Sequence, residues 1–534
     1  MGSNGSKFAK LWSDGVAREV DDLRNIPRPT LGDVVGGVSV ALILIPQSIA
    51  NAGLAGLPPV VGLFAAAFPL LIFALFASSP YLQTGPVALT SLLAAGALIG
   101  AGFEPDTTDY IAAAGLLAVI VGVTRLLIGV TRLGSVVYLM AEPVTIGFTS
   151  GAGVVILTSQ LSKALGVVLP ADVADQGNPI VRGVWALVHP GEWSLGAILF
   201  SVVTLAFMLL GRRVHRLFPG VLIAVVVTLG FARLSGYSGP SIDSVPSGLP
   251  TFSFDLPWSS VTSLLAGGIV IALIGFAEPA SIARSFASET QSRWSSSREF
   301  LASGLANMVA GVTGAYPVGG SFARSSVNKI AGAETRWSGA ITSLVVLAFL
   351  PFAFVLDGLP DAVLGAVVIG AVFSLIKPRR LWRFNKRSPW QAALAYLTFV
   401  ATLVSPPNIH YAVLFGIAAT LLLHVIRPFR LEVLQTDDGD LDLRPRGLLW
   451  IGTNTRFADE LTEAIEADRG HGSVTVSLDR STAIDTATAA ALASGQRAAD
   501  AAGRSFVVSN PPRGAEVVLD GFDVPVLYAA DGET

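Results

Sequence analysis

The stretch that decides the fold is Tyr316–Arg324, whose sequence is YPVGGSFAR. It places one proline and two glycines directly before a short apolar segment at 321–333. QTGP at 83–86 likewise places one glycine and one proline at the start of the segment at 86–102. Proline lacks a backbone donor and glycine is conformationally free, so both residues interrupt helices. Interrupted backbone in a membrane is tolerated where it lines a cavity or packs inside protein. The pattern therefore predicts two half-length helices that begin inside a membrane domain.

Long apolar segments surround these two interruptions. A bilayer core about 30 Å thick requires roughly 20 apolar residues per helix. Several segments are shorter than that, so twelve crossings are an alternative to fourteen. The segments, bounded by proline, glycine or charge, lie near 33–51, 59–77, 86–102, 110–130, 142–168, 194–211, 217–234, 261–286, 300–316, 321–333, 337–356, 361–376, 389–405 and 410–427.

The positions of lysine and arginine favour fourteen crossings with both termini in the cytoplasm, because cytoplasmic loops are enriched in these residues. The loops on the opposite side, near 52–58, 103–109, 169–193, 235–260, 357–360 and 406–409, contain one basic residue, Arg182. The connections predicted to face the cytoplasm contain Arg132, Arg212, Arg213, Arg216, Arg293, Arg298, Lys377, Arg379, Arg380, Arg383, Lys386 and Arg387.

The overall charge composition agrees with a membrane protein that has a soluble tail. Charged residues make up 14% of the chain, against about 25% in soluble domains. Residues 431–534 carry 18 acidic and 8 basic side chains, which leaves 20 acidic and 27 basic ones in the first 430 residues. This distribution excludes a single soluble enzyme, a disordered chain and a nucleic-acid binder with a basic patch. The absence of cysteine, and five scattered histidines, predict no disulfide, thiol nucleophile or metal site.

The two interrupted segments are the third and the tenth, at matching positions of two seven-span halves. Short segments broken by glycine or proline at such positions are typical of transporters with inverted repeats. Two opposed helix N-termini present positive dipole ends and free N–H groups, which favour an anion. The alternative is a pair of ordinary loops with a helix-starting proline and capping glycines.

Glu278 is the ionisable residue that stands out inside an apolar span, where charge is costly and usually functional. Burial favours its protonated form, so it is a candidate proton carrier. The alternative is a structural carboxyl that is hydrogen-bonded to a broken neighbouring helix.

Arg324 lies in the first turn of the tenth segment, where a cation opposes the helix dipole. A guanidinium beside free N–H groups suits a tetrahedral or carboxylate anion, and an ion pair with Glu278 is expected in the empty site. The alternative is an arginine that extends to the membrane interface. Gln47, beside Pro46, is a further polar candidate for the same cavity, although it could instead bond to another helix.

Four motifs, in the right order along nearly the whole chain, resemble those of the SulP anion permeases. They agree with the topology derived independently from the apolar segments. The motifs are PQSIANAGLAGLPPVVGLF at 46–64, Gly85-Pro86-Val87-Ala88, EPASIAR at 278–284, and the run from Arg298-Glu299-Phe300 through Asn307 to Gly320-Ser321-Phe322-Ala323-Arg324-Ser325.

The resemblance implies a seven-plus-seven inverted repeat with a core domain and a gate domain, and an elevator-like movement. It implies that Glu278 is the coupling carboxylate of proton-driven members. Two departures from the family pattern are Asn51, where an aromatic residue is usual, and Ala323, which removes one hydroxyl donor from the site. The retained Arg324 favours a dianion such as sulfate over bicarbonate. The substrate site implied by the resemblance consists of Gln47, Pro86, Val87, Ala88, Gly320, Ser321, Phe322, Ala323 and Arg324.

The C-terminal segment predicts a small α/β layer. A β-branched strand at 474–479 leads into an alanine-rich helix at 486–502 and a second strand at 505–509. The pattern LDRSTAIDT at 478–486 resembles STAS domains, in which the position of Thr486 is phosphorylated in some members. Helix capping by Asp485 is the alternative explanation, and the one we favour.

The sequence therefore predicts a polytopic α-helical membrane protein with a cytoplasmic STAS domain. The expected parts are a polar cytoplasmic segment at 1–32 that is no signal peptide, a transport domain at 33–430 and the STAS domain at 431–534. We expect no enzyme activity, no cofactor and no nucleic-acid partner. The expected function is proton-coupled uptake of a small anion through the cell (inner) membrane by a homodimer. The alternatives are a sodium-coupled bicarbonate or dicarboxylate carrier, an anion channel or electromechanical element, and a nucleobase permease.

Overall fold

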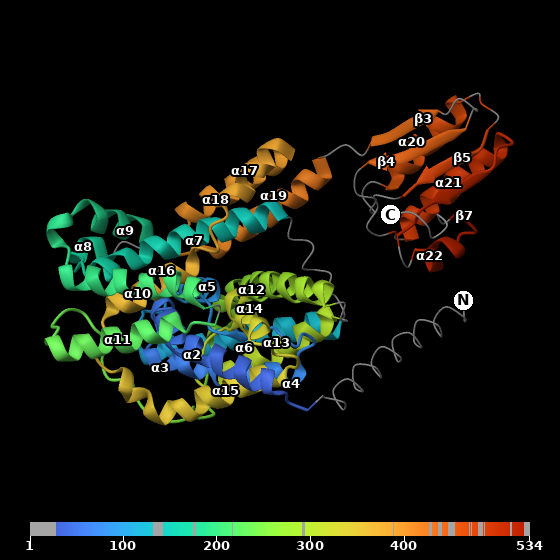
Figure 1. Ribbon diagram of the computed structural model, residues 1–534. Helices are drawn as coiled ribbons and strands as arrows, with labels where there is room; N and C mark the ends of the chain where they lie inside the picture. The colour runs from blue at the N-terminus through green and yellow to red at the C-terminus, as the bar shows by residue number, and fades with distance from the viewer. Residues whose placement is uncertain are drawn as a thin grey trace. The chain divides into compact units, whose positions relative to one another are not determined.

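The structure is a computed structural model in which two compact units divide the chain at Ile417 and Ala418 (Figure 1). It describes residues 28–131, 142–174, 178–215, 217–290, 294–387, 389–426, 430–435, 440–446, 454–468, 470, 472–478, 484, 486–512 and 515–527. The predictions for residues 1–27, for Arg132, Arg216 and Arg293, and for 479–483 lie outside these residues.

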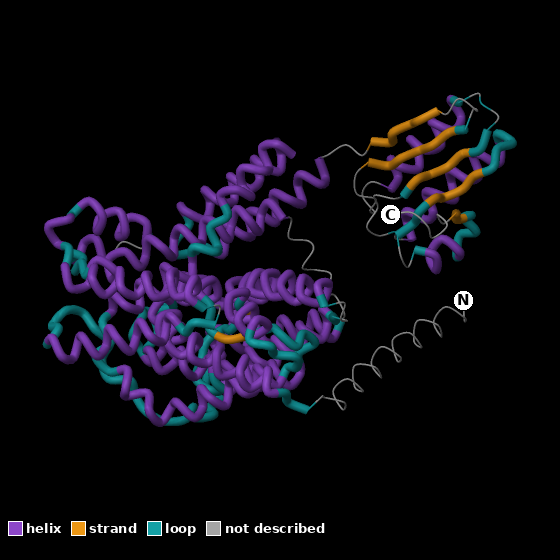
Figure 2. The backbone as a smooth tube through the Cα atoms, viewed as in Figure 1, coloured by secondary structure: helices purple, strands orange, loops and turns teal. Residues whose placement is uncertain are grey.

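The first unit is built from helices, and each of the fourteen predicted apolar segments coincides with one helix or a closely joined pair (Figure 2). In the first half these are α2 (Leu31–Leu54), α3 (Pro59–Ala66) with α4 (Phe68–Phe76), α5 (Ala88–Gly100), α6 (Thr108–Val130), α7 (Glu142–Leu165), α10 (Leu195–Val214) and α11 (Gly220–Ser235). In the second half they are α12 (Val261–Glu289), α13 (Ser296–Val312), α14 (Phe322–Ile330), α15 (Trp337–Phe349) with the 3-10 helix η4 (Leu350–Leu356), α16 (Asp361–Val372), α18 (Pro389–Val404) and α19 (His410–Ile426).

Six described helices are long and apolar enough to cross a membrane, counting α3 with α4 and α15 with η4. The fold class is therefore confirmed, and the number of fourteen crossings stays a prediction. Three further helices lie in segments that were predicted to be loops. They are α8 (Ala171–Ala174), α9 (Pro179–Val188) and the basic helix α17 (Pro378–Arg387).

The two interrupted segments meet in a short antiparallel ladder between β1 (Thr84–Gly85) and β2 (Gly319–Gly320). Thr84 faces Gly320 and Gly85 faces Gly319, and α5 and α14 begin directly after these strands. Gly85 has a φ of 147°, which a side chain would strain, and a Cβ on Gly320 would lie 2.9 Å from Pro279. The prediction of two half-length helices that begin inside the membrane domain is thereby confirmed.

Helices α6 and α13 pack closely through small residues. A Cβ on Gly122 would lie 2.8 Å from the carbonyl oxygen of Gly304, and one on Gly311 would lie 2.5 Å from that of Gly115. Small residues let membrane helices approach at backbone distance. This closely packed pair carries Arg125 and Asn307, whose side chains bond the backbone just before β2.

The second unit contains a five-stranded sheet in the order β3-β4-β5-β6-β7, seen as the layer of strands in Figure 2. Strand β3 (Arg430–Gln435) runs antiparallel to β4 (Leu441–Arg446), whereas β5 (Val474–Ser477), β6 (Phe506–Ser509) and β7 (Val526–Leu527) continue in parallel. The helices are α20 (Asn454–Ala467), α21 (Thr486–Ala501) and α22 (Glu516–Asp520). The predicted strand–helix–strand order is confirmed, as expected for a STAS domain.

The second unit also contains a buried ion pair that connects the ends of α20 and α21. The Arg504 guanidinium lies 2.6 Å from the Asp468 carboxylate, with the two side chains 1% and 7% exposed. Its Nε donates to the carbonyl of Gly472, which precedes β5, at 2.7 Å. The hydrogen bond from Arg504 lowers the pKa of Asp468.

Replacing Arg504 by alanine is expected to destabilise the second unit by about 3 kcal/mol at pH 7, because the buried carboxylate loses its partner. A lowered folded-state pKa stabilises the fold above the unfolded pKa of about 4, and the effect is lost as the pH falls through the folded value. Hydrogen exchange of peptides covering β5 and β6 in the full chain measures this loss. Alanine at the exposed Arg497 is the control, and equal protection in both variants would contradict the prediction.

Candidate functional site

A cavity with a volume of about 70 Å3 lies between the N-terminal ends of α5 and α14. Its remaining walls come from α2, α12 and α16, and α12 packs against both α5 and α14. In Figure 1 the labels of α5, α12 and α14 lie together in the helical unit. The lining residues are Gln47, Ala50, Asn51, Val87, Ala88, Leu89, Glu278, Gly320, Ser321, Phe322, Ala323, Arg324, Val367, Val368, Ala371, Val372, Ser374 and Leu375.

The structure thus brings every predicted substrate-binding residue except Pro86 to the lining of one cavity, together with Glu278. Pro86 contributes through its carbonyl oxygen, which accepts hydrogen bonds from Arg324 Nη1 at 3.0 Å and from Asn51 Nδ2 at 3.1 Å. Thr486 lies in the other unit, where it begins α21, and its side chain is outside the described residues.

The two helix N-termini supply backbone donors to the cavity. Val87, the residue before α5, makes no side-chain cap, so the first-turn N–H groups of α5 have no acceptor from that residue. At α14 the Ser321 hydroxyl oxygen caps the helix by accepting from the Arg324 N–H at 3.5 Å. Each N-terminus also carries a partial positive charge. The geometry therefore favours a negatively charged occupant.

The ladder continues beyond β1 and β2 and fixes both helix starts. The Ser321 N–H donates to the Gln83 carbonyl at 3.0 Å, and the Gln83 N–H donates to the Ser325 hydroxyl at 2.9 Å. Because the start of α14 is bonded to the residue before β1, and β1 leads directly into α5, the two half-helices are positioned as one body.

Arg324 is the charged centre of this cavity. Its side chain is 1% exposed, and only Nη1 has a hydrogen-bond acceptor among the described residues, the Pro86 carbonyl. Nε and Nη2 are buried without an acceptor in that part of the chain. A buried donor without a partner is costly, and a charged one more so. Extension to the membrane interface is excluded by this burial, and the free donors suit an anion.

Glu278 lies on α12 immediately before Pro279 and contributes to the same wall. The expectation of an ion pair between Glu278 and Arg324 is wrong, since no such pair is present among the described residues. The reason is that the Arg324 guanidinium is directed to the Pro86 carbonyl at the start of α5.

Gln47 and Asn51 lie one helical turn apart on α2 and both line the cavity. Asn51 replaces the aromatic residue usual in the SulP pattern, and its amide helps to hold the Pro86 carbonyl. This contact was not anticipated from the sequence. The opposite wall, from α16, is apolar apart from Ser374.

Two buried residues that were not predicted as site residues hold the backbone just before β2. Arg125, on α6, donates to the carbonyl oxygens of Ala272, Ile271 and Val318 and to the Ser303 hydroxyl, at 2.8 to 3.2 Å. Asn307, on α13, accepts from the Val318 N–H at 2.9 Å and donates to its carbonyl at 3.2 Å. The signal for Arg125 was visible, because it is an arginine within an apolar span.

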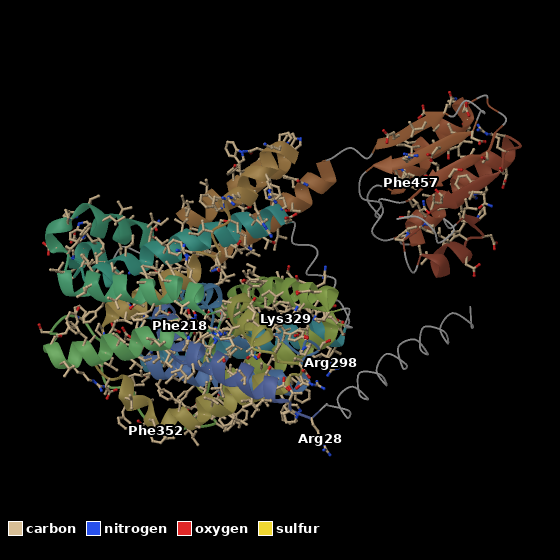
Figure 3. All side chains as sticks on the ribbon, in the orientation of Figure 1. Arg28, Phe218, Arg298, Lys329, Phe352 and Phe457 are labelled. Atoms are coloured by element: carbon tan, nitrogen blue, oxygen red, sulfur yellow. The ribbon has the colours of Figure 1, made fainter. Side chains whose placement is uncertain are left out.

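The far end of α14 is also anchored to α12. Lys329, labelled in Figure 3, lies 2.7 Å from the carboxylate of Glu289 and near the rings of Tyr81 and Phe286. Asn328 donates to the carbonyl of Tyr81 at 3.2 Å and to the Ser338 hydroxyl at 2.8 Å. Both ends of this short helix are therefore fixed.

The sequence profile described as the sulfate permease family matches residues 31–398. The chain belongs to the sulfate permease family. Sulfate transporter 4.1, chloroplastic, of Arabidopsis thaliana is 31% identical over 73% of this chain and 57% of its own length. A probable sulfate transporter of Mycobacterium tuberculosis is 32% identical over 77% of this chain and 72% of its own length. This sulfate permease family chain thus aligns with less than two thirds of the Arabidopsis relative.

Solved structures show the same fold. The murine Solute Carrier 26 family member A9 anion transporter, in the inward-facing state, has a TM-score of 0.73 and 19% identity, over 96% of this chain and 91% of that one. The transmembrane domain of the cyanobacterial bicarbonate transporter BicA has a TM-score of 0.60 and 24% identity, over 73% of this chain and 97% of that one. The protein is therefore a multi-pass membrane member of a family of transporters, not of enzymes.

Proposed function

We propose that the protein is a secondary active transporter of a small anion, with sulfate as its principal substrate. The observation that carries the proposal is the buried Arg324, which lines a cavity between two helix N-termini and whose Nε and Nη2 have no acceptor among the described residues. Guanidinium and backbone N–H groups together match the oxygen atoms of a tetrahedral dianion. The sulfate transporters of Arabidopsis and Mycobacterium named above support this choice of substrate.

Bicarbonate or a dicarboxylate, coupled to sodium, is the second candidate. Ala323 removes one hydroxyl donor from the turn that begins α14, which weakens the case for a substrate with four acceptor oxygens. The fold shared with the bicarbonate transporter BicA is consistent with this candidate. A single buried guanidinium can also pair with a planar carboxylate in a bidentate geometry.

An elevator-like movement is part of the proposal. Most polar groups of the cavity come from α2, α12 and the start of α14, whereas α16 contributes Val367, Val368 and Val372, and the turn after it contributes Leu375. An apolar wall offers no fixed hydrogen bond, so an anion held by the first set of helices could slide past it. Because α5 and α14 are joined through β1 and β2, they would move together.

Proton coupling is assigned to Glu278, the carboxyl group in the cavity wall. A proton on this group would remove the negative charge that repels an incoming anion. The anion and the proton would therefore favour each other's binding. An anion channel would not need such a group.

The proposal also covers membrane placement and assembly. The basic connections support a cytoplasmic location of both termini and of the STAS domain. We place the cytoplasmic segment at 1–32, the transport domain at 33–430 and the STAS domain at 431–534, in a homodimer in the cell membrane.

Uptake of labelled sulfate, bicarbonate and fumarate into proteoliposomes, with and without an inward proton gradient, tests the function. We expect sulfate uptake to rise with the gradient and to exceed uptake of the other two anions. Gradient-independent uptake that requires sodium would support the second candidate instead. Uptake of none of the three would contradict the assignment to this substrate class.

Replacing Glu278 by glutamine is expected to remove the gradient dependence, because an amide cannot exchange a proton at this position. The rate of sulfate uptake should become the same with and without the gradient. The control is Glu192→Gln, whose side chain is exposed and outside the cavity. Retained gradient dependence in Glu278→Gln would assign the coupling to another group.

A further inference from the structure

A second cavity, with a volume of about 290 Å3, lies near the C-terminal ends of α2, α5 and α7. Helix α9 and the connection at 406–409 complete its wall. The segments that surround it include four of the connections predicted to face away from the cytoplasm, near 52–58, 103–109, 169–193 and 406–409. None of its lining residues belongs to the cavity around Arg324.

The charged residues in the described lining of this second cavity are all cations. Lys163 and Arg182 are its charged lining residues, and no aspartate or glutamate is found among the described residues of the wall. Neither cation forms an ion pair within the described part of the chain. Gln160, Ser162 and Tyr110 add polar groups to the same wall. Unpaired cations in a concave surface attract anions more strongly than the same charges in open water.

The two cavities lie in series along two shared helices. On α5, Leu89 lines the first cavity and Leu92 lines the second, and on α2 the corresponding residues are Asn51 and Leu54. Three residues of an α-helix correspond to about 4.5 Å along its axis. About one helical turn therefore separates the two spaces.

The helix dipole accounts for the position of one of the two cations along its helix, and it does not account for the position of the other. Lys163 lies in the last turn of α7, where a cation is stabilised by the dipole. Arg182 lies in the first half of α9, which offers no such stabilisation. It is also the single basic residue in the connections predicted to face away from the cytoplasm, so the membrane-orientation preference of arginine does not account for it.

We propose that this second cavity is an anion-binding vestibule, in which Lys163 and Arg182 hold an inorganic oxyanion on the non-cytoplasmic side before it reaches Arg324. The proposal rests on the transport function above. The vestibule raises the local concentration of the anion next to the transport site. The two cations are expected to attract and bind the oxyanion, because no acidic residue among the described residues of the wall neutralises them.

The natural absence of cysteine allows a direct test with the full chain in proteoliposomes. Ile99 lines the vestibule and is 39% exposed, so Ile99→Cys reports on the vestibule without removing either cation. Its labelling rate is measured with a negatively and a positively charged methanethiosulfonate. Leu249→Cys is the control, because Leu249 is 57% exposed, lies outside the vestibule and belongs to a connection predicted to face the same side.

The ratio of the two labelling rates cancels differences in thiol reactivity at each position. We expect the ratio of anionic to cationic labelling to be about tenfold higher at position 99 than at position 249. Adding Lys163→Gln or Arg182→Gln to Ile99→Cys should lower the ratio, and adding both should bring it to the control value. Inorganic sulfate, at constant ionic strength, should slow labelling at position 99 and leave position 249 unchanged.

Equal ratios at the two positions, or a ratio unaffected by removing both cations, would overturn the vestibule. A charge-selective reaction that sulfate does not slow would overturn it as well, because attraction without binding is not a site. Labelling rates do not depend on turnover. A failure of sulfate uptake would therefore contradict the transport function. A failure of sulfate to slow labelling at position 99 would contradict the vestibule.

Discussion

Replacing Arg324 by glutamine will lower the apparent affinity for the transported anion by at least about 100-fold. The guanidinium is buried in the cavity lining, donates one hydrogen bond to Pro86, and leaves Nε and Nη2 without an acceptor in the part of the chain that the structure describes. Charged hydrogen bonds of a buried pair are worth about 2–5 kcal/mol, and each 1.4 kcal/mol corresponds to about a factor of ten. Saturation of labelled sulfate uptake, and sulfate binding to the purified protein, measure the loss.

Two further variants separate charge from geometry. Arg324→Lys keeps the positive charge but loses the planar donor set, so an intermediate loss of affinity is expected. Arg284→Gln removes an exposed cation from α12 outside the cavity and should leave the affinity unchanged. An unchanged affinity of Arg324→Gln for every transported anion would show that the anion binds elsewhere.

The helices around the cavity could be predicted because their signals are local. Proline and glycine at 83–86 and 316–320 interrupt apolar segments, and the structure begins α5 and α14 directly after them. The resemblance to a known family, carried by four motifs in order, predicted that one cavity is lined by Gln47, Glu278 and Ser321. The prediction needed neither distances nor side-chain directions.

Side-chain directions could not be predicted, because they depend on partners that are distant in sequence. Arg324 bonds to the carbonyl of Pro86, 238 residues away, rather than to Glu278. The apolar segments of a sequence indicate which residues are buried. They do not indicate which carbonyl a guanidinium will reach. Asn51 was noted as a departure from the SulP pattern, and its bond to the same carbonyl emerged from the structure alone.

Two of the three helices that were predicted to be loops, α9 and α17, were missed for a related reason. Helix α9 begins at Pro179 after an Asn178 cap, and has ten residues. Helix α17 also has ten residues and is rich in arginine. Both are too short or too charged to be recognised as spans, since about 20 apolar residues define that signal.

Replacing Arg125 is expected to have the second large effect on the protein, because Arg125 fixes the backbone just before β2, which leads into α14. Arg125 is completely buried, and its four hydrogen bonds join α6 to α12, to α13 and to the Val318 carbonyl. Arg125→Gln is expected to lower the free energy of unfolding by about 3–5 kcal/mol, because glutamine cannot reach four acceptors and leaves carbonyls buried without donors. Thermal unfolding in detergent measures this loss, with Arg213→Gln on the exposed end of α10 as the control.

A role in positioning the site requires a measurement that a general loss of stability would not change. Asn307 holds the same residue, Val318, so Arg125→Gln and Asn307→Ala act on one short backbone segment. In variants that remain folded, we expect both to lower sulfate affinity, with the double variant losing less than the sum of the single losses. Hydrogen exchange should rise first in peptides covering 316–324. Additive losses, with exchange raised evenly across α6 and α13, would restrict Arg125 to a structural role. Coupled losses would show that the anion site depends on the hydrogen bonds that fix the backbone before Gly319.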